Sequence, residues 1–161
     1  KHININTEEI SIVKAACNLE AIVDAAVKMI KLSLIDQQIN FEKKVNGPAD
    51  FVGDEKRIKE VVYNILKNAC EALPGSGTIL IELERNRNQL ICRITDNGVG
   101  IPEAQQGMLF KPFFSTKKPE TNNFGLGLTY CYLVMKEHKG KIEIKSEEKV
   151  GTSVCLIFPV Q

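Results

Sequence analysis

The most informative pattern of apolar and polar positions lies between Asp54 and Leu73. In a helix, which turns by about 100° per residue, this stretch gathers its apolar side chains on one broad arc. The arc consists of Ile58, Val61, Val62, Ile65, Leu66, Ala69, Ala72 and Leu73. Beside it runs a narrow polar stripe made of Arg57, Glu60, Asn64, Asn68 and Glu71. The pattern predicts a helix over 54–73, with Asp54 as its N-cap, that packs on a core and keeps one polar edge.

Hydrophobic periodicity also predicts the remaining elements of the fold. Apolar residues at helical spacing indicate two more helices, over 18–34 and 126–138. Alternating apolar and polar residues indicate strands over 39–45, 78–83, 90–95, 141–145 and 152–158. Together these elements predict an α/β (α+β) two-layer sandwich, in which three main helices cover one face of a mixed, mainly antiparallel sheet. We interpret the weakly patterned residues 1–17 as a linker that precedes a single domain over 18–161.

Composition and charge limit the classes of function. Of the 161 residues, 43% are hydrophobic and 25% are charged, as in one compact domain with an ordinary core. The net charge of +1 provides no strong field for binding nucleic acid or an anionic membrane surface. Five widely spaced cysteines favour free thiols in a reducing, cytoplasmic compartment. No apolar run approaches the roughly 20 residues of a membrane span, so we expect any anchor of the parent protein to lie outside this sequence.

Two asparagines one helical turn apart, Asn64 and Asn68, carry the first candidate chemistry. Asparagine is a poor helix former, and a single one in a helix is most commonly a surface or capping amide. Two in register at the edge of an apolar face point more strongly to a function. With carboxylates nearby, their amide oxygens could hold Mg²⁺, which takes few protein ligands and keeps water and phosphate oxygens.

Glycine-rich segments supply two further candidate sites. Asp96 ends a predicted strand and is followed by Gly98 and Gly100. This pattern is typical either of a plain tight turn or of a loop whose backbone approaches a ligand beside a carboxylate. Further along, Gly125-Leu126-Gly127-Leu128 opens a predicted helix, where free backbone N–H groups and the helix dipole attract phosphate oxygens. The long segment 102–124 contains three phenylalanines and predicts a lid that docks over a site.

Taken together, these motifs resemble those of a known family. Their order along the chain is Asn64-x-x-x-Asn68, Asp96-x-Gly98-x-Gly100, Phe110-x-x-Phe113-Phe114, Gly125-x-Gly127-Leu128 and Gly151-Thr152. The set is similar to the N, G1, F, G2 and G3 boxes of the ATP-binding domain of sensor histidine kinases, which has the Bergerat fold of the GHKL superfamily. The resemblance covers about residues 18–159. The segment KPFFSTK is most similar to kinases of the sporulation and nitrogen-regulation type.

The resemblance implies a role for each matching position. Asn68 resembles the Mg²⁺ ligand, and Asn64 resembles its partner on the same helix. Asp96 resembles the aspartate that accepts a hydrogen bond from the adenine amino group. This role is physically reasonable, because a carboxylate there would pair with adenine and would oppose the carbonyl of guanine. Lys117 would be a cationic contact from the lid. The other positions of the implied ATP-binding set are Gly98, Gly100, Ile101, Gly125, Leu126, Gly127, Leu128 and Thr152.

The residue at position 64 bears on the kind of reaction. Hydrolytic members of the superfamily carry a glutamate base there, whereas this chain has Asn64. An amide cannot activate water, so phosphorylation of a histidine, which is already a nucleophile, is favoured over hydrolysis. Glu60, one turn earlier, is the residue that could act as a base instead. Asn64 and Glu60 are therefore the candidate catalytic residues.

The phosphoacceptor histidine is expected outside this sequence. Neither His2 nor His138 stands in a suitable context, and we interpret His138 as a solvated helix end. The resemblance thus implies a cytoplasmic catalytic domain, monomeric in isolation and without direct membrane contact, that binds ATP and Mg²⁺. It would phosphorylate a histidine on a separate dimerisation hairpin, for relay to a response regulator. The alternatives are an ATPase of the same fold and a nucleotide-binding module without phosphotransfer. The lid is expected to become ordered when the phosphates bind.

Overall fold

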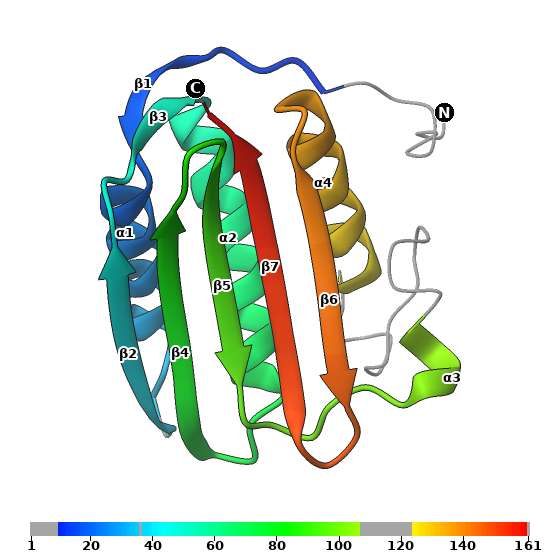
Figure 1. Cartoon of the computed structure of the whole chain (residues 1–161). Coiled ribbons are helices and arrows are strands. Elements are labelled where there is room, and N and C mark those ends of the chain that lie inside the picture. Colours follow the sequence, from blue (N-terminus) through cyan, green and yellow to red (C-terminus); the bar gives the residue numbers. More distant parts are fainter. Residues whose placement is uncertain (1–9, 36, 107–123, 161) are drawn as a thin grey trace, which may run out of the picture.

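The computed structural model describes residues 10–35, 37–106 and 124–160 (Figure 1). Within these ranges, no helix is both long enough and apolar enough to cross a membrane. The elements in chain order are β1 Ala15–Asn18, α1 Leu19–Leu32, β2 Gln38–Asn46, β3 Asp50–Gly53, α2 Glu55–Glu71, β4 Ser76–Arg85, β5 Gln89–Asp96, α3 Glu103–Gln106, α4 Phe124–Glu137, β6 Lys141–Glu147 and β7 Gly151–Pro159.

Five strands form the main sheet, in the order β2-β4-β5-β7-β6. Strand β2 pairs with β4 in parallel, whereas the pairs β4–β5, β5–β7 and β6–β7 are antiparallel. Helices α1, α2 and α4 all lie against the same face of this sheet, and the core is buried between the two layers (Figure 1). The predicted two-layer α+β sandwich with a mixed, mainly antiparallel sheet is therefore confirmed.

Helix α2 is the central helix of its layer and contacts both α1 and α4. Its N-cap is Asp54, whose carboxylate accepts a hydrogen bond from the N–H of Arg57 at 3.0 Å, as the sequence predicts. The predicted apolar arc is buried except at Ala72, which is half-buried. Each large side chain of the arc contributes about 1.5–3 kcal/mol by leaving water. The polar stripe beside the arc lies at the edge of the core, where a site can form.

A small second sheet pairs β1 with β3 in antiparallel orientation. The sequence pattern does not predict these strands, because four residues are too few for an alternation to be recognised. The pairing brings the N–H of Val13 to the carboxylate of Asp54, at 2.8 Å from Oδ2. Burial favours the neutral form of Asp54, but the hydrogen bonds from Val13 and Arg57 outweigh it and lower the pKa of the carboxyl. Part of the segment that we interpret as a linker thus packs on the domain. The boundary between linker and domain stays a prediction.

His138, the residue after α4, is buried, with only 5% of its surface exposed, so the prediction of a solvated helix end is wrong. Its Nε2 accepts a hydrogen bond from the N–H of Asp54 at 3.0 Å, and its Nδ1 lies 2.8 Å from the carbonyl oxygen of Val134. Because Nε2 accepts, Nδ1 carries the proton, and the imidazole is neutral. The ring also packs edge-on against Phe158, with 5.9 Å between centroids. Asp54 lies 84 residues away in sequence, so local periodicity cannot reveal this burial.

Lowering the pH is expected to destabilise the domain through His138. Burial lowers the pKa of the imidazole below its ordinary value of 6.5, against the opposite effect of the Val134 carbonyl. Lys14 also lowers this pKa, whereas Asp54 and Glu137 raise it. Since the folded pKa is the lower one, the stabilising contribution is complete above pH 6.5 and is lost as the pH falls through 6.5 towards the folded pKa. Chemical denaturation between about pH 7.5 and 5 should show a steeper loss of unfolding free energy for wild type than for His138→Gln; equal slopes would contradict this assignment.

Candidate nucleotide-binding site

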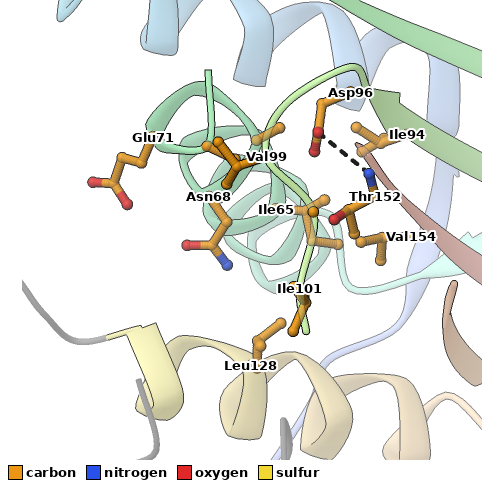
Figure 2. A pocket seen from close by; sticks show the side chains of 13 residues that line it. Ile65, Asn68, Glu71, Ile94, Asp96, Val99, Ile101, Leu128, Thr152 and Val154 are labelled. Carbon is orange, nitrogen blue, oxygen red and sulfur yellow. Dashed lines mark hydrogen bonds between the residues drawn. The ribbon is translucent and has the colours of Figure 1, made fainter. Parts of the chain in front are cut away.

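A cavity of about 230 Å³ lies between α2, the end of β5, the loop that follows it, α4 and β7. Figure 2 shows the side chains that converge on it from these elements. Its wall is mostly apolar with a few polar groups, as is usual for sites that bind small molecules. The lining residues are Ile65, Asn68, Ala69, Glu71, Ala72, Ile94, Asp96, Val99, Gly100, Ile101, Leu128, Thr152 and Val154.

Asp96 ends β5 and is 7% exposed. Its Oδ1 accepts a hydrogen bond from the N–H of Gly98 at 2.8 Å. It accepts a second one from the N–H of Thr152 at 3.3 Å (Figure 2). Burial raises the pKa of this carboxyl, and the two hydrogen bonds offset the effect only in part. Within the described part of the chain, both bonds go to Oδ1, which leaves Oδ2 to accept a hydrogen bond from a ligand. A buried carboxylate gains most from such a donor because little water reaches it.

The loop 97–101 is held from two sides by backbone hydrogen bonds. Val99 donates its N–H to the carbonyl of Ala72 at 3.1 Å, and its own carbonyl accepts from the N–H of Lys149 at 2.6 Å. A Cβ atom on Gly98 would lie 2.5 Å from the Ala72 carbonyl oxygen, so a side chain there would push the loop away from α2. The glycine at position 98 is thus required by the protein's own packing. Its approach to a purine base stays a prediction.

The two asparagines of the polar stripe line different hollows. Asn68 lies on the α2 side of the pocket, with Glu71 further along the same helix (Figure 2). Asn64 lines a neighbouring surface hollow together with Glu60 and Tyr130. The helix therefore places both amides along one edge of the domain, as predicted, but only Asn68 reaches the pocket that contains Asp96. The roles of Asn68 and Asn64 toward Mg²⁺ stay predictions.

Glu60 is engaged by a side chain that the sequence pattern does not single out. The hydroxyl of Tyr130 on α4 donates a hydrogen bond to Glu60 Oε1 and accepts one from Arg57 Nη1 at 2.9 Å. Burial, followed by the bond to Glu60, raises the pKa of Tyr130 to about 12, so the hydroxyl keeps its proton. As long as this contact persists, one oxygen of Glu60 is occupied. This contact does not involve Oε2, so a role for Glu60 as a base stays a prediction.

The groups available for Mg²⁺ at this site are few. Within residues 10–35, 37–106 and 124–160, no three His, Cys, Asp or Glu side chains cluster closely enough to hold a metal ion. Asn68 can offer one amide oxygen, and Glu71 lines the same pocket. This donor set fits Mg²⁺ that arrives with phosphates and keeps part of its water shell. It does not fit a metal held by protein ligands alone.

Helix α4 begins at Phe124, two residues before the predicted start at position 126. The motif Gly125-Leu126-Gly127 consequently lies in the first helical turn, whose N–H groups have no partner within the helix. Leu128 follows, is 4% exposed and lines the pocket. Lys117 and the phenylalanines of the predicted lid lie outside the described residues.

The pocket contains side chains that the motifs do not indicate. Apolar residues of α2, β5 and β7 form much of its wall, and their periodicity reads only as core packing. Ser146 of β6 lies behind Thr152, and the hydroxyl groups of the two residues are hydrogen-bonded to each other. No local pattern distinguishes Ser146 from any other serine near a strand end, since its partners lie across the β6–β7 turn and in the loop after β5.

Comparison with protein families defines the class to which this fold and site belong. The family model described as histidine kinase-, DNA gyrase B-, and HSP90-like ATPase matches residues 53–161. The chain belongs to this family of ATPases, and binding of ATP is the property that the family name implies. The predicted resemblance to GHKL ATPases is thereby confirmed.

The chain is also similar to several histidine kinases. Sporulation kinase C of Bacillus subtilis (strain 168) is 36% identical over 109 residues, which are 68% of this chain and 25% of that protein. Sporulation kinase B of the same organism is 40% identical over 108 residues, 66% of this chain and 24% of that protein. The catalytic domain of histidine kinase ThkA superposes with a TM-score of 0.81 at 27% identity, covering 92% of this chain and 99% of that structure. The chain spans about a quarter of the length of these curated relatives.

Proposed function

We propose that this chain is the ATP- and Mg²⁺-binding catalytic domain of a two-component sensor histidine kinase. It would transfer the γ-phosphate of ATP to a histidine on a dimerisation hairpin outside residues 18–161. The observation that carries the proposal is the buried carboxylate of Asp96, which has one oxygen held by the protein and the other left to a ligand in an apolar pocket. Such a group recognises a hydrogen-bond donor at the edge of a flat molecule whose faces pack on apolar side chains, and adenine is such a molecule.

The two sides of the pocket suit the two ends of ATP. Figure 2 shows Asp96 and Thr152 at one side and Leu128 of α4 at the other. With the adenine amino group at Asp96, the phosphates would extend towards Asn68 and the first turn of α4. The N–H groups of that turn, which have no partner within the helix, and the helix dipole favour negative charge. In this orientation, the backbone of Gly125 and Gly127 would lie next to the phosphates.

The reaction that best fits these residues is transfer to an imidazole. Asn64 cannot take a proton from water, and one oxygen of Glu60 already accepts a hydrogen bond from Tyr130. A neutral imidazole nitrogen needs no base before it attacks, so alignment and charge neutralisation are sufficient. Mg²⁺ held with ATP at Asn68 would neutralise charge on the transferring phosphate. This chain would supply the binding, the orientation and the exclusion of water.

The acceptor and the later steps belong to other parts of the system. His138 is buried and hydrogen-bonded at both ring nitrogens, which excludes it as an acceptor in this conformation. We therefore assign the phosphorylated histidine to a helical hairpin of the parent protein, and the next acceptor to a response regulator. A cytoplasmic location, in which ATP is available, follows from the same proposal.

The test combines this chain with ATP, Mg²⁺ and a separately produced histidine-bearing hairpin of the parent protein. Acid-labile phosphate on the hairpin, absent when its histidine is replaced by glutamine, would support the kinase. Release of inorganic phosphate without labelling of the hairpin would identify an ATPase instead. Binding of ATP with neither product would identify a nucleotide-binding module.

Asn68→Ala is expected to reduce the dependence of ATP binding on Mg²⁺. The variant loses the amide oxygen proposed as a metal ligand, so the gain in ATP affinity on adding Mg²⁺ should fall by about tenfold. Titration calorimetry with and without Mg²⁺ measures this gain directly. Asn40→Ala, on the exposed strand β2, is the matched control and should behave as wild type. An Asn68→Ala variant with the full metal response would assign the ligand to another residue.

A further inference from the structure

Ser146, near the end of β6, makes three hydrogen bonds through its hydroxyl oxygen. The N–H of Ile101 donates to Ser146 Oγ at 2.8 Å. The carbonyl oxygen of Gly151 lies 3.1 Å from Ser146 Oγ, and the hydroxyl of Thr152 lies 2.8 Å from it. Thr152 lines the pocket, so Ser146 stands one layer behind the pocket wall and connects two of its residues, Ile101 and Thr152.

The directions of these bonds follow from the protons that are available. A serine hydroxyl has one proton and can accept two hydrogen bonds. An N–H can only donate and a carbonyl can only accept. All three partners are satisfied when Ser146 donates to Gly151 and accepts from both Ile101 and Thr152. The hydroxyl proton of Thr152 then points at Ser146, and only lone pairs of the Thr152 oxygen remain for the pocket.

We infer that Ser146 is a positioning residue that makes this end of the pocket selective for purines with a 6-amino group. The inference rests on the proposed ATP-binding function and adds to it a second contribution to base selectivity, beside that of Asp96. With the proton of Thr152 turned away, its oxygen and Asp96 Oδ2 both present acceptors to a ligand. An exocyclic 6-amino group has two protons to donate, whereas the 6-carbonyl of guanine has none and would face two acceptors.

The loop beside the pocket has other supports that do not use the Ser146 hydroxyl. Gln106 Nε2 donates to the carbonyl of Ile101 at 2.8 Å and to the carbonyl of Ser146 at 3.0 Å. Backbone pairing of β6 with β7 also places Ser146 opposite Thr152. Ser146→Ala should therefore keep the loop in place and release the hydroxyl of Thr152, which can then turn its proton towards the pocket. This makes base selectivity the property that changes most.

The test measures nucleotide affinities of wild type and Ser146→Ala by titration calorimetry at constant Mg²⁺. The probes are ATP, GTP and purine riboside triphosphate, which is ATP without its 6-amino group. We expect Ser146→Ala to bind ATP about tenfold more weakly and to show a smaller preference for ATP over GTP, while its affinity for purine riboside triphosphate stays the same. Ser153→Ala is the matched control. Ser153 is next to Thr152 on β7 but does not line the pocket, and its hydroxyl lies 3.1 Å from that of Thr95.

Three outcomes would overturn the inference. Equal weakening of ATP and purine riboside triphosphate would show that Ser146 supports only the loop. Unchanged ATP affinity in Ser146→Ala, with wild type binding ATP normally, would remove Ser146 from base recognition and leave the proposed function intact. A wild-type chain that binds none of the three nucleotides would overturn the proposed function, and this inference with it.

Discussion

Replacing Asp96 with asparagine is expected to weaken ATP binding by roughly 1.5–3 kcal/mol, or about 10- to 150-fold. The side-chain oxygen of asparagine can keep the two backbone hydrogen bonds that Oδ1 of Asp96 accepts from Gly98 and Thr152. Its NH₂ group would then point into the pocket in place of Oδ2. A donor would face the adenine amino group, which is also a donor, so the variant loses a charge-assisted bond and gains an unfavourable contact.

Because the fold-supporting bonds persist, the effect of Asp96→Asn should be seen in affinity more than in stability. Titration calorimetry with ATP gives the first quantity and chemical denaturation the second. Asp50→Asn is a control of the same chemistry at an exposed site, where the carboxylate bonds Asn18 at 2.9 Å. If both variants lost affinity equally, the cause would be net charge. If Asp96→Asn bound ATP as wild type does, the base would have to lie elsewhere.

Replacing Gly100 with alanine is expected to lower the free energy of unfolding by about 3 kcal/mol or more and to reduce ATP affinity. Gly100 has φ +74°, a conformation that residues with a side chain adopt at a cost of about 1–2 kcal/mol. A Cβ atom there would also lie well under 3.0 Å from the backbone carbonyl oxygen of Glu147. The β6–β7 turn cannot yield as a flexible side chain would, so the loop that lines the pocket must move.

Gly75→Ala separates the two costs at position 100. Gly75 has a similar φ of +92°, but no atom lies within 4 Å of a Cβ placed on it. This control should therefore lose only the conformational term, about 1 kcal/mol, and should keep wild-type affinity for ATP. Chemical denaturation and calorimetry of both variants provide the comparison. Equal losses of stability at the two positions would show that the contact with Glu147 does not contribute to the loss at Gly100.

Local sequence patterns account for most of the secondary structure. The helix over 54–73 is observed as α2 with its cap at Asp54, and the five predicted strands form the main sheet within two residues of the expected ends. These features depend on neighbours two to four positions apart, and such neighbours are visible in the sequence. The order of the boxes also indicated the family correctly, because a set of short motifs in fixed order is specific even when each motif alone is not.

Long-range contacts explain the differences between expectation and structure. Strands β1 and β3 exist because they pair with each other, and His138 is buried because Asp54 and Phe158 come from distant elements. Helical spacing placed Asn64 and Asn68 on one face, yet the packing of α4 assigns them to different hollows. A pattern along one helix does not contain the position of the neighbouring helix, so these outcomes could not be read from it.

The sequence by itself determined the main helices and strands, the layer architecture and the family, because periodicity and motif order are properties of the chain alone. Only the tertiary structure decided which oxygen of Asp96 is left for a ligand, that Tyr130 donates a hydrogen bond to Glu60, and that Ser146 lies behind Thr152. Each of these depends on the partner or the direction of a hydrogen bond between different strands or helices. Such directions arise when the strands and helices pack, and they decide what the pocket can recognise.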